Sequence, residues 1–320
     1  MKKISYVIPC YKSHETIEDV VIEINQTMEN LKDYQSEIIL VNDNPQDATY
    51  LKIKEIASKY KNIVGINLTR NFGQHAALMA GFHNASGDII VCLDDDGQTP
   101  ANEVGKLIEK IEEGYDVVYA SYKKKKHSLF RNLGSKVNDK MAQSMIGKPK
   151  KLQVTSFFAA RKIIIDEVKK YDNCYPYVIG LILRTTQNIC NVEVTHRERK
   201  IGKSGYSFKK LIKLWLNGFT AFSVKPLRIA TFLGIGTAFA GMIYLIYLIV
   251  NFFAFNSAPI GWRSLMVVLL VLGGVILFVL GLIGEYIGRS YICLNSSPQF
   301  VVRDVVKSEE KNDNESTNSN

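Results

Sequence analysis

The 320-residue chain has only five cysteines, and no two of them form a close pair. Cys10, Cys92, Cys174, Cys190 and Cys293 are odd in number and widely spaced, without a CxxC motif. Disulfide frameworks and zinc sites both need paired cysteines at short or regular spacing. The pattern therefore argues against both and indicates reduced thiols in a cytosolic setting.

Several other signals are also missing. The chain contains neither GxGxxG nor GxxxxGK[ST], which makes dinucleotide enzymes and P-loop NTPases poor candidates. The apolar stretch at its start is too short for a signal peptide and is interrupted by Pro9 and Lys12. Basic residues outnumber acidic ones, 40 to 31, for a net charge of +9. This balance favours anionic partners, but no nucleic-acid-binding motif is present.

Two long apolar runs stand in the last third of the chain. Residues 229–250 and 264–284 carry no charge, and each is long enough to cross a bilayer. A buried helical hairpin in a soluble core is the alternative. Cations precede the first run and follow the second, at Lys209, Lys210, Lys213, Lys225, Arg228, Arg289, Arg303 and Lys307. The positive-inside rule then predicts two spans, about 229–252 and 263–287, with both termini in the cytoplasm.

The part before these runs alternates between β-rich and helical patterns. Strands are predicted at residues 4–8, 37–41, 63–68 and 89–93, and helices at 15–31, 48–60 and 74–84. Such alternation predicts βαβ units and a mainly parallel sheet. Ligands of these sheets bind at the carboxyl ends of the strands. We therefore expect a site formed by residues 9–11, 42–44 and 94–98.

An acidic cluster directly follows the fourth predicted strand. Asp94, Asp95 and Asp96 are adjacent, and Gln98 comes two residues later. Oxygen ligands in a short loop suit Mg²⁺ or Mn²⁺ shared with a substrate diphosphate. A solvated acidic turn that caps the next helix is an equally good interpretation of this cluster alone, because Thr99-Pro100 is typical of a helix start.

The boundaries of the predicted parts follow from composition. Residues 1–205 form the soluble α/β domain, residues 206–228 a juxtamembrane segment, residues 229–288 the two spans, and residues 289–320 a cytoplasmic tail with a disordered end. Aromatic and aliphatic residues at helical spacing in 206–222 indicate either a core-facing helix or one lying in the lipid headgroups. Because every predicted strand lies upstream of residue 229, a chain ending there should fold and bind nucleotide.

The motifs occur in a recognisable order. They are VIPCY at 7–11, VNDN at 41–44, RNFGQH at 70–75, LDDDGQTP at 93–100, HRER at 196–199, GKSGYS at 202–207, KPLR at 225–228 and GEYIGR at 284–289. This set resembles family 2 glycosyltransferases with the Rossmann-like GT-A fold. The closer resemblance is to the polyisoprenyl-phosphate glycosyltransferases, which include dolichol-phosphate mannose synthase and bacterial undecaprenyl-phosphate sugar transferases. It covers nearly the whole chain except the tail.

The resemblance implies a donor pocket. Asp43 matches an aspartate that hydrogen-bonds the nucleotide base, and Pro9 and Tyr11 line the same pocket. Asp95 belongs to the same donor-binding group.

A second implied group is an Asp-x-Asp-x-Gln motif formed by Asp94, Asp96 and Gln98, which holds nucleotide and metal. Arg131 and Arg199 match basic residues that clamp the acceptor phosphate, a task suited to the planar guanidinium. Some relatives carry an acidic residue near positions 153–156, and none stands here.

The implied activity is metal-dependent, inverting transfer of one sugar from a nucleotide-diphosphate sugar, with UDP the favoured carrier. The acceptor would be polyprenyl phosphate in the cytoplasmic leaflet of a bacterial membrane, for cell-envelope glycan or lipid modification. Relatives form tetramers, so a homo-oligomer is expected. The alternatives are a membrane enzyme that extends a glycan or glycolipid, and an inactive nucleotide-binding scaffold. A processive polymer synthase is disfavoured by the two spans and the lack of a Gln-x-x-Arg-Trp motif.

Overall fold

The structure is a computed structural model that describes residues 1–122, 143, 148–150, 152–195, 197, 225–255, 261–295 and 297–307. Two compact units are present. The first comprises Met1–Gly205 with Ser297–Asn320, and the second comprises Tyr206–Ser296. Arg131, Arg199 and the segment 206–222 lie outside the described residues.

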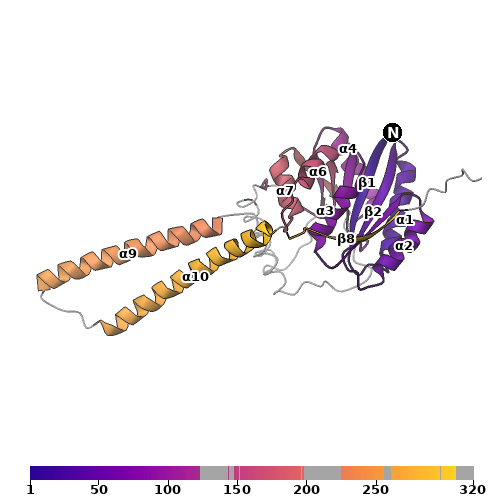
Figure 1. Ribbon diagram of the computed structural model, residues 1–320. Helices are drawn as coiled ribbons and strands as arrows, with labels where there is room; N and C mark the ends of the chain where they lie inside the picture. Colours follow the sequence, from indigo (N-terminus) through magenta and orange to yellow (C-terminus); the bar gives the residue numbers. More distant parts are fainter. Residues whose placement is uncertain are drawn as a thin grey trace, which may run out of the picture. The chain divides into compact units, whose positions relative to one another are not determined.

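The described part of the first unit, shown in Figure 1, is built on one sheet. It has eight strands in the order β7-β5-β6-β4-β1-β2-β3-β8. The strands are β1 (Lys2–Cys10), β2 (Tyr34–Asn42), β3 (Ile63–Leu68), β4 (Ile89–Cys92), β5 (Val117–Tyr122), β6 (Phe158–Arg161), β7 (Ile189–Val194) and β8 (Val302–Lys307). Neighbouring strands are parallel except where β6 or β8 is involved. The predicted mainly parallel α/β fold is confirmed.

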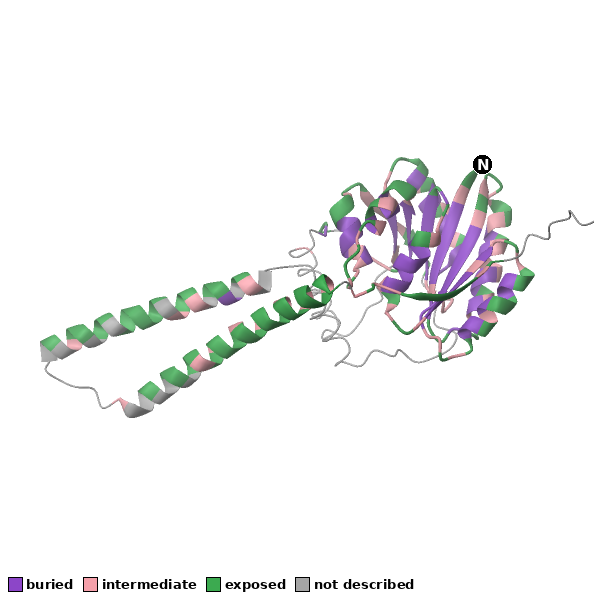
Figure 2. Ribbon diagram, viewed as in Figure 1, coloured by how far each residue is buried: buried purple, intermediate pink, exposed green. Residues whose placement is uncertain are grey.

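Helices connect these strands. They are α1 (Ile17–Asn30), α2 (Thr49–Lys59), α3 (Gln74–Asn84), η1 (Ala101–Glu103), α4 (Val104–Glu112), α6 (Lys162–Lys169) and α7 (Val178–Thr185). The first three coincide with the predicted helices to within two residues at each end. Figure 2 shows most strands as buried, as expected for a parallel sheet covered on both faces.

The core forms where apolar faces of the helices meet the strands. On α1 the buried side chains Val20, Val21 and Ile24 follow helical spacing, and they join Tyr6 and Ile38 in one apolar cluster. Fully burying an aliphatic side chain of this size contributes about 1.5–3 kcal/mol. The central strands are thereby held rigidly, which fixes where their carboxyl-end loops begin.

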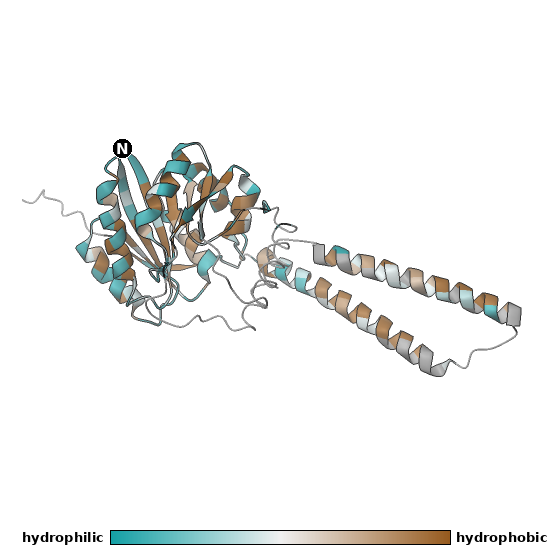
Figure 3. Cartoon of the chain, turned by 180° about the vertical axis from the view of Figure 1, so that it is seen from behind, coloured by the Kyte–Doolittle hydropathy of each residue, from teal (hydrophilic) through white to brown (hydrophobic). Residues whose placement is uncertain are grey.

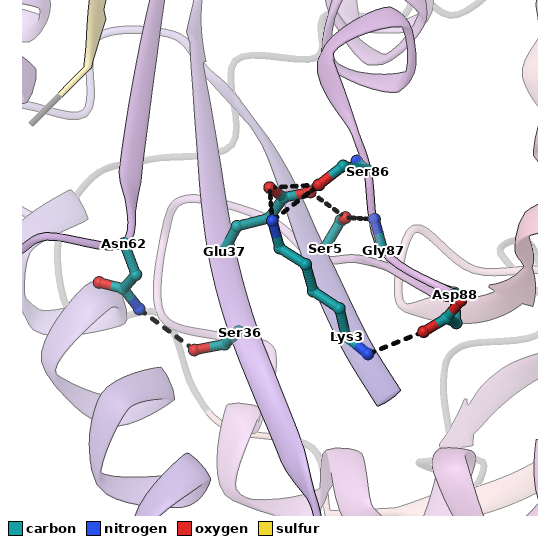
Figure 4. Close-up of polar contacts among 8 residues, drawn as sticks. All are labelled: Lys3, Ser5, Ser36, Glu37, Asn62, Ser86, Gly87 and Asp88. Carbon is teal, nitrogen blue, oxygen red and sulfur yellow. Dashed lines mark hydrogen bonds and ion pairs between the residues drawn. The ribbon is translucent and has the colours of Figure 1, made fainter. Parts of the chain in front are cut away.

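A polar network lies toward the amino-terminal ends of the parallel strands, away from the carboxyl-end loops (Figure 4). The buried Glu37 carboxylate accepts hydrogen bonds from the Ser5 hydroxyl and from the Ser86 N–H at 2.6 Å, and it pairs with Lys3 Nζ at 2.6 Å. Gly87 N–H donates to Ser5 Oγ at 2.7 Å. A Cβ at position 87 would lie 2.6 Å from that oxygen, so only glycine fits. The network joins β1, β2 and the turn before β4.

The strand β8 was not expected from the sequence. It follows the apolar hairpin in the chain and pairs antiparallel with β3, so the predicted tail 289–320 contains part of the sheet. The prediction that every strand lies upstream of residue 229 is wrong for this reason. A chain ending there would leave the outer edge of β3 unpaired, which weakens the expectation that it folds and binds nucleotide.

The second unit contains two long helices, α9 (Lys225–Phe255) and α10 (Trp262–Leu294). Their most apolar stretches, Ala230–Asn251 and Val271–Leu294, cover 22 and 24 residues and are long enough to cross a membrane. Figure 3 colours many residues of both helices as hydrophobic. Large apolar side chains are exposed on both, with Phe232 at 72% and Leu277 at 71%. Exposure on this scale suits lipid better than water. The helix α10 extends beyond the predicted end of the second span at residue 287.

Candidate active site

The predicted site loops lie at one edge of the sheet. In the parallel register Cys10 is opposite Asn42, and Asn42 is opposite Asn67, so β1, β2 and β3 end side by side. The neighbouring strand β4 pairs with β1 in the same direction. The loop after β1, the Asn42–Asp43 pair and the aspartate cluster are therefore brought to the same carboxyl edge, as the sequence predicted.

Asp94 is held from two sides. Gln74 Nε2, at the start of α3, donates to Asp94 Oδ1 at 3.2 Å, and the exposed Ser156 hydroxyl, just before β6, donates to Oδ2. Both carboxylate oxygens thus have a donor, which fixes the orientation of the carboxylate plane. The sequence reasoning missed Gln74 and Ser156 because neither lies near Asp94 in the chain.

Asp96 and Gln98 form the outer part of the cluster. Asp96 Oδ1 accepts a hydrogen bond from the Gln98 N–H at 3.0 Å, which closes a tight turn through Gly97. Gly97 has a φ of 71°, in the left-handed region that favours glycine. This turn fixes the Asp96 carboxylate against the backbone of Gln98.

Asp95 has a different environment from its two neighbours. Its Oδ2 accepts the Tyr11 N–H at 2.9 Å, and its carbonyl oxygen accepts the Thr16 hydroxyl at 2.6 Å. Burial raises the pKa of Asp95 to about 6, against the Tyr11 hydrogen bond that lowers it. The Asp95 side chain joins the aspartate loop to the loop after β1. Direct contact of Asp95 with a nucleotide-sugar substrate stays a prediction.

Asp43 organises a second loop. It is almost fully buried, and its oxygens accept the N–H groups of Phe72 at 2.7 Å and Gly73 at 2.8 Å. Burial raises the pKa of Asp43, and these two hydrogen bonds oppose the rise. Gly73 has a φ of 94°, which a residue with a side chain would adopt only with strain. The predicted contact of Asp43 with a nucleotide base remains untested.

Tyr11 and Pro9 border the same region. The Tyr11 side chain is 52% exposed, whereas Pro9 is half-buried at the end of β1. An exposed aromatic ring beside a polar sheet edge provides a stacking surface for a planar ligand.

The half-buried His75 packs edge-on against Tyr177, with ring centroids 5.0 Å apart, and desolvation of its ring lowers the pKa of His75 to about 4. It is neutral near pH 7 and supplies no positive charge for a phosphate.

The described residues fit a metal shared with substrate better than a metal held by protein alone. Within this part of the chain, no three His, Cys, Asp or Glu side chains converge as ligands. Magnesium often takes only one or two carboxylates and completes its shell with substrate phosphates and water. Asp96 and Asp94, with the Gln98 amide, offer oxygen donors of this kind, whereas the Asp95 carboxylate is directed to Tyr11.

An open groove of about 510 Å³ borders Asp96 on the side of α1. It is lined in part by Glu15, Asp19, Glu23, Asp96, Asn102 and Arg197. Arg197 pairs with Glu23 at 2.7 Å and donates to Asn102 Oδ1 at 2.8 Å. The charged groups of its lining are four carboxylates and one arginine, so without a bound cation the groove does not suit the phosphates of a nucleotide. Arg197, the first arginine of the HRER motif, is anchored here by these two contacts.

Two family models match the chain. One, described as glycosyl transferase family 2, matches residues 5–169, and the other, described as GtrB C-terminal hairpin, matches residues 225–290. Undecaprenyl-phosphate 4-deoxy-4-formamido-L-arabinose transferase from Proteus mirabilis is 33% identical over 320 residues, which cover 98% of this chain and 97% of that protein.

Two solved structures are more distant. Glucosyl-3-phosphoglycerate synthase from Mycobacterium tuberculosis, crystallised with Mn²⁺ and UDP-glucose, is 20% identical with a TM-score of 0.49, over 73% of this chain and 78% of that chain. Mannosyl-3-phosphoglycerate synthase from Rubrobacter xylanophilus is 14% identical with a TM-score of 0.47, over 68% and 71%.

Proposed function

This chain belongs to glycosyl transferase family 2 and carries the GtrB C-terminal hairpin, and from that membership we propose that it transfers one sugar from a nucleotide-diphosphate sugar to polyprenyl phosphate. A single observation carries the proposal: the similarity to an undecaprenyl-phosphate sugar transferase extends over 98% of the chain, through both the catalytic unit and the hairpin. The acceptor is then undecaprenyl phosphate, and the donor is a UDP-sugar.

The donor side of the site is assigned to the sheet edge. The exposed Tyr11 ring and half-buried Pro9 would pack against the nucleoside, near the loop that Asp43 holds in place. Asp96 and Gln98 would hold Mg²⁺ or Mn²⁺ against the diphosphate, with Asp94 alongside. When bound, the cation offsets the charge that develops on the departing nucleoside diphosphate.

The acceptor side needs little acid–base chemistry. A phosphate monoester is already anionic near pH 7, so its oxygen can attack the anomeric carbon without a strong general base. Positions 153–156 carry no carboxylate that could act as a general base. The Ser156 hydroxyl in this stretch donates to Asp94. Orientation of the two reactants then supplies most of the acceleration. A single displacement inverts the anomeric configuration, and Arg131 and Arg199 would clamp the phosphate.

Chain connectivity supports the proposed membrane topology. Residues 297–307 are part of the same unit as Met1–Gly205, so the chain that leaves this unit must return to it. Two spans allow that return, whereas one span would not. With cations flanking both spans, the catalytic unit and both termini are assigned to the cytoplasmic side of a bacterial membrane, where the donor is available.

The test is direct. Membranes containing the protein are incubated with a panel of radiolabelled nucleotide sugars and short-chain polyprenyl phosphate, and the organic phase is assayed for label. One UDP-sugar should label the lipid, and the Asp96→Asn variant should not. Label that enters a glycan or glycolipid but never polyprenyl phosphate would contradict the proposed acceptor.

A further inference from the structure

Residues 297–307, here called the C-terminal strap, follow the hairpin and end in β8. The strap is fixed to the catalytic unit at its start. Gln299 Nε2 donates to the carbonyl oxygens of Tyr171 at 3.1 Å and Asn173 at 3.0 Å, in the turn between α6 and α7. The centroid of the Phe300 ring lies 5.8 Å from the centroid of the His83 ring of α3.

The other end of the strap is fixed as well. Asp304 accepts the Tyr50 hydroxyl at 2.8 Å and pairs with Lys54 at 3.2 Å, both from α2. Val306 pairs with Gly65 of β3, and a Cβ added at Gly65 would lie 2.7 Å from Val306 Cγ1. A glycine at this position of β3 lets the strap approach closely. These contacts at both ends distinguish the strap from a loose tail.

Between its ends the strap binds both backbone polar groups of Thr69. The Thr69 N–H donates to the Val301 carbonyl at 2.9 Å, and the Arg303 guanidinium donates to the Thr69 carbonyl at 3.4 Å. Leu68 is opposite Val302 and Asn67 is opposite Asp304, so Arg303 is the extra residue of a β-bulge. A bulge changes the direction of a side chain relative to the regular strand.

Thr69 directly precedes the loop 70–73, and Asp43 binds the far end of that loop through Phe72 and Gly73. Only Arg70 and Asn71 separate the two anchors, and both are exposed. The Arg70 guanidinium lies 4.6 Å from the centre of the Phe72 ring, within the same loop. A four-residue loop attached at both ends has little freedom, so its position depends on the strap as well as on Asp43.

We propose that the C-terminal strap positions the 70–73 loop for donor binding and that Arg303 is a positioning residue in it. This inference rests on the proposed function, because the loop matters for catalysis only if the pocket near Asp43 binds a nucleoside diphosphate. It assigns a role in the donor site to residues that follow the membrane hairpin. Loss of the Arg303 contact should loosen the loop and weaken donor binding while leaving the acceptor side unchanged.

The test uses full-length protein in detergent or nanodiscs, with the variants Arg303→Ala and Arg303→Lys. Lys307→Ala is the matched control, because Lys307 is an exposed cation of the same strand but lies opposite Val64, at the other end of β3. The first readout is hydrogen exchange of the amides of residues 69–74 without nucleotide. The second is the dissociation constant of UDP with Mn²⁺, together with the KM values for donor and acceptor.

Arg303→Ala should speed exchange at residues 69–74 and raise the UDP dissociation constant and donor KM about 3- to 10-fold. The acceptor KM, kcat and Tm should be unchanged, Arg303→Lys should recover part of the loss, and Lys307→Ala should match wild type. Unchanged exchange in Arg303→Ala, or altered exchange with wild-type donor KM, overturns the inference. Failure of the wild-type protein to bind UDP or any other nucleoside diphosphate would instead overturn the proposed function. The hydrogen-exchange result does not depend on that outcome, because exchange is measured without nucleotide.

Discussion

Replacing Glu37 by glutamine should destabilise the catalytic unit without affecting its chemistry. The substitution keeps the size of the side chain but removes its charge, and it places an amide NH₂ group among the Ser5, Ser86 and Lys3 donors of Figure 4. Breaking a buried ion pair costs about 3–5 kcal/mol. The Lys3 side chain is 37% exposed, so water screens part of the pair and we take the low end, about 3 kcal/mol.

The assay is thermal unfolding of the full-length protein in detergent. For a domain of this size each kcal/mol lowers Tm by about 2–4 °C, so Glu37→Gln should lower it by about 6–12 °C. Glu29→Gln, an exposed glutamate on α1, is the matched control and should leave Tm unchanged. Donor KM should also be unchanged, because Glu37 is opposite Ser5, five residues before the Asn42 end of β2. A Tm within 1–2 °C of wild type would refute the assigned role of this network.

The pH dependence of stability provides a second check on Glu37. Burial by itself would raise the pKa of Glu37, but hydrogen bonds from Lys3, Ser5 and Ser86 outweigh it, and the pKa is lowered. A lowered pKa in the folded protein means that the stabilisation is present above the unfolded value, near 4.3. It is lost as the pH falls through the lower folded value. The Tm difference between wild type and Glu37→Gln should therefore be full at pH 7 and shrink below about pH 4.

Three further outcomes are expected. Ser156→Ala should lower kcat/KM by about 10-fold and leave Tm unchanged, because it removes one hydrogen bond to the Asp94 carboxylate; steady-state kinetics with wild-type values would contradict this. Asp43→Ala should release the Phe72 and Gly73 amides and raise the dissociation constant for nucleoside diphosphate in calorimetry at least 10-fold, whereas equal weakening of acceptor use would argue against a donor-side role. Chelation should abolish transfer, Mg²⁺ or Mn²⁺ should restore it, and full activity in excess chelator would exclude metal dependence.

Much of the first half of the fold could be predicted from local pattern. The strands β1 to β4 are short, apolar and bounded by polar turns, and the intervening helices follow helical periodicity, so their parallel order and common edge follow from the sequence. The strand β8 could not be found in this way. It is a mostly exposed six-residue strand, and its partner β3 lies more than 230 residues earlier in the chain.

The candidate site was predictable only where it depends on position along a strand. Asp43 comes directly after β2, and Asp94 and Asp96 follow the end of β4 within four residues, and that placed them at the sheet edge. The sequence cannot distinguish Asp95 from its neighbours, because its separate role depends on the Tyr11 backbone N–H, 84 residues away. Ser156 was missed for a related reason: the antiparallel strand β6 begins at the same edge, and antiparallel pairing left no local signal.

The central claim is that the acceptor is a polyprenyl phosphate. The measurement that tests it most directly is product analysis by mass spectrometry, with purified full-length protein, a UDP-sugar that labels membranes, and undecaprenyl phosphate. We predict one sugar per lipid, joined through a phosphodiester with inverted anomeric configuration, and one UDP released for each lipid modified. Nucleotide-sugar turnover that does not depend on undecaprenyl phosphate, or a product with more than one sugar per lipid, would contradict the account.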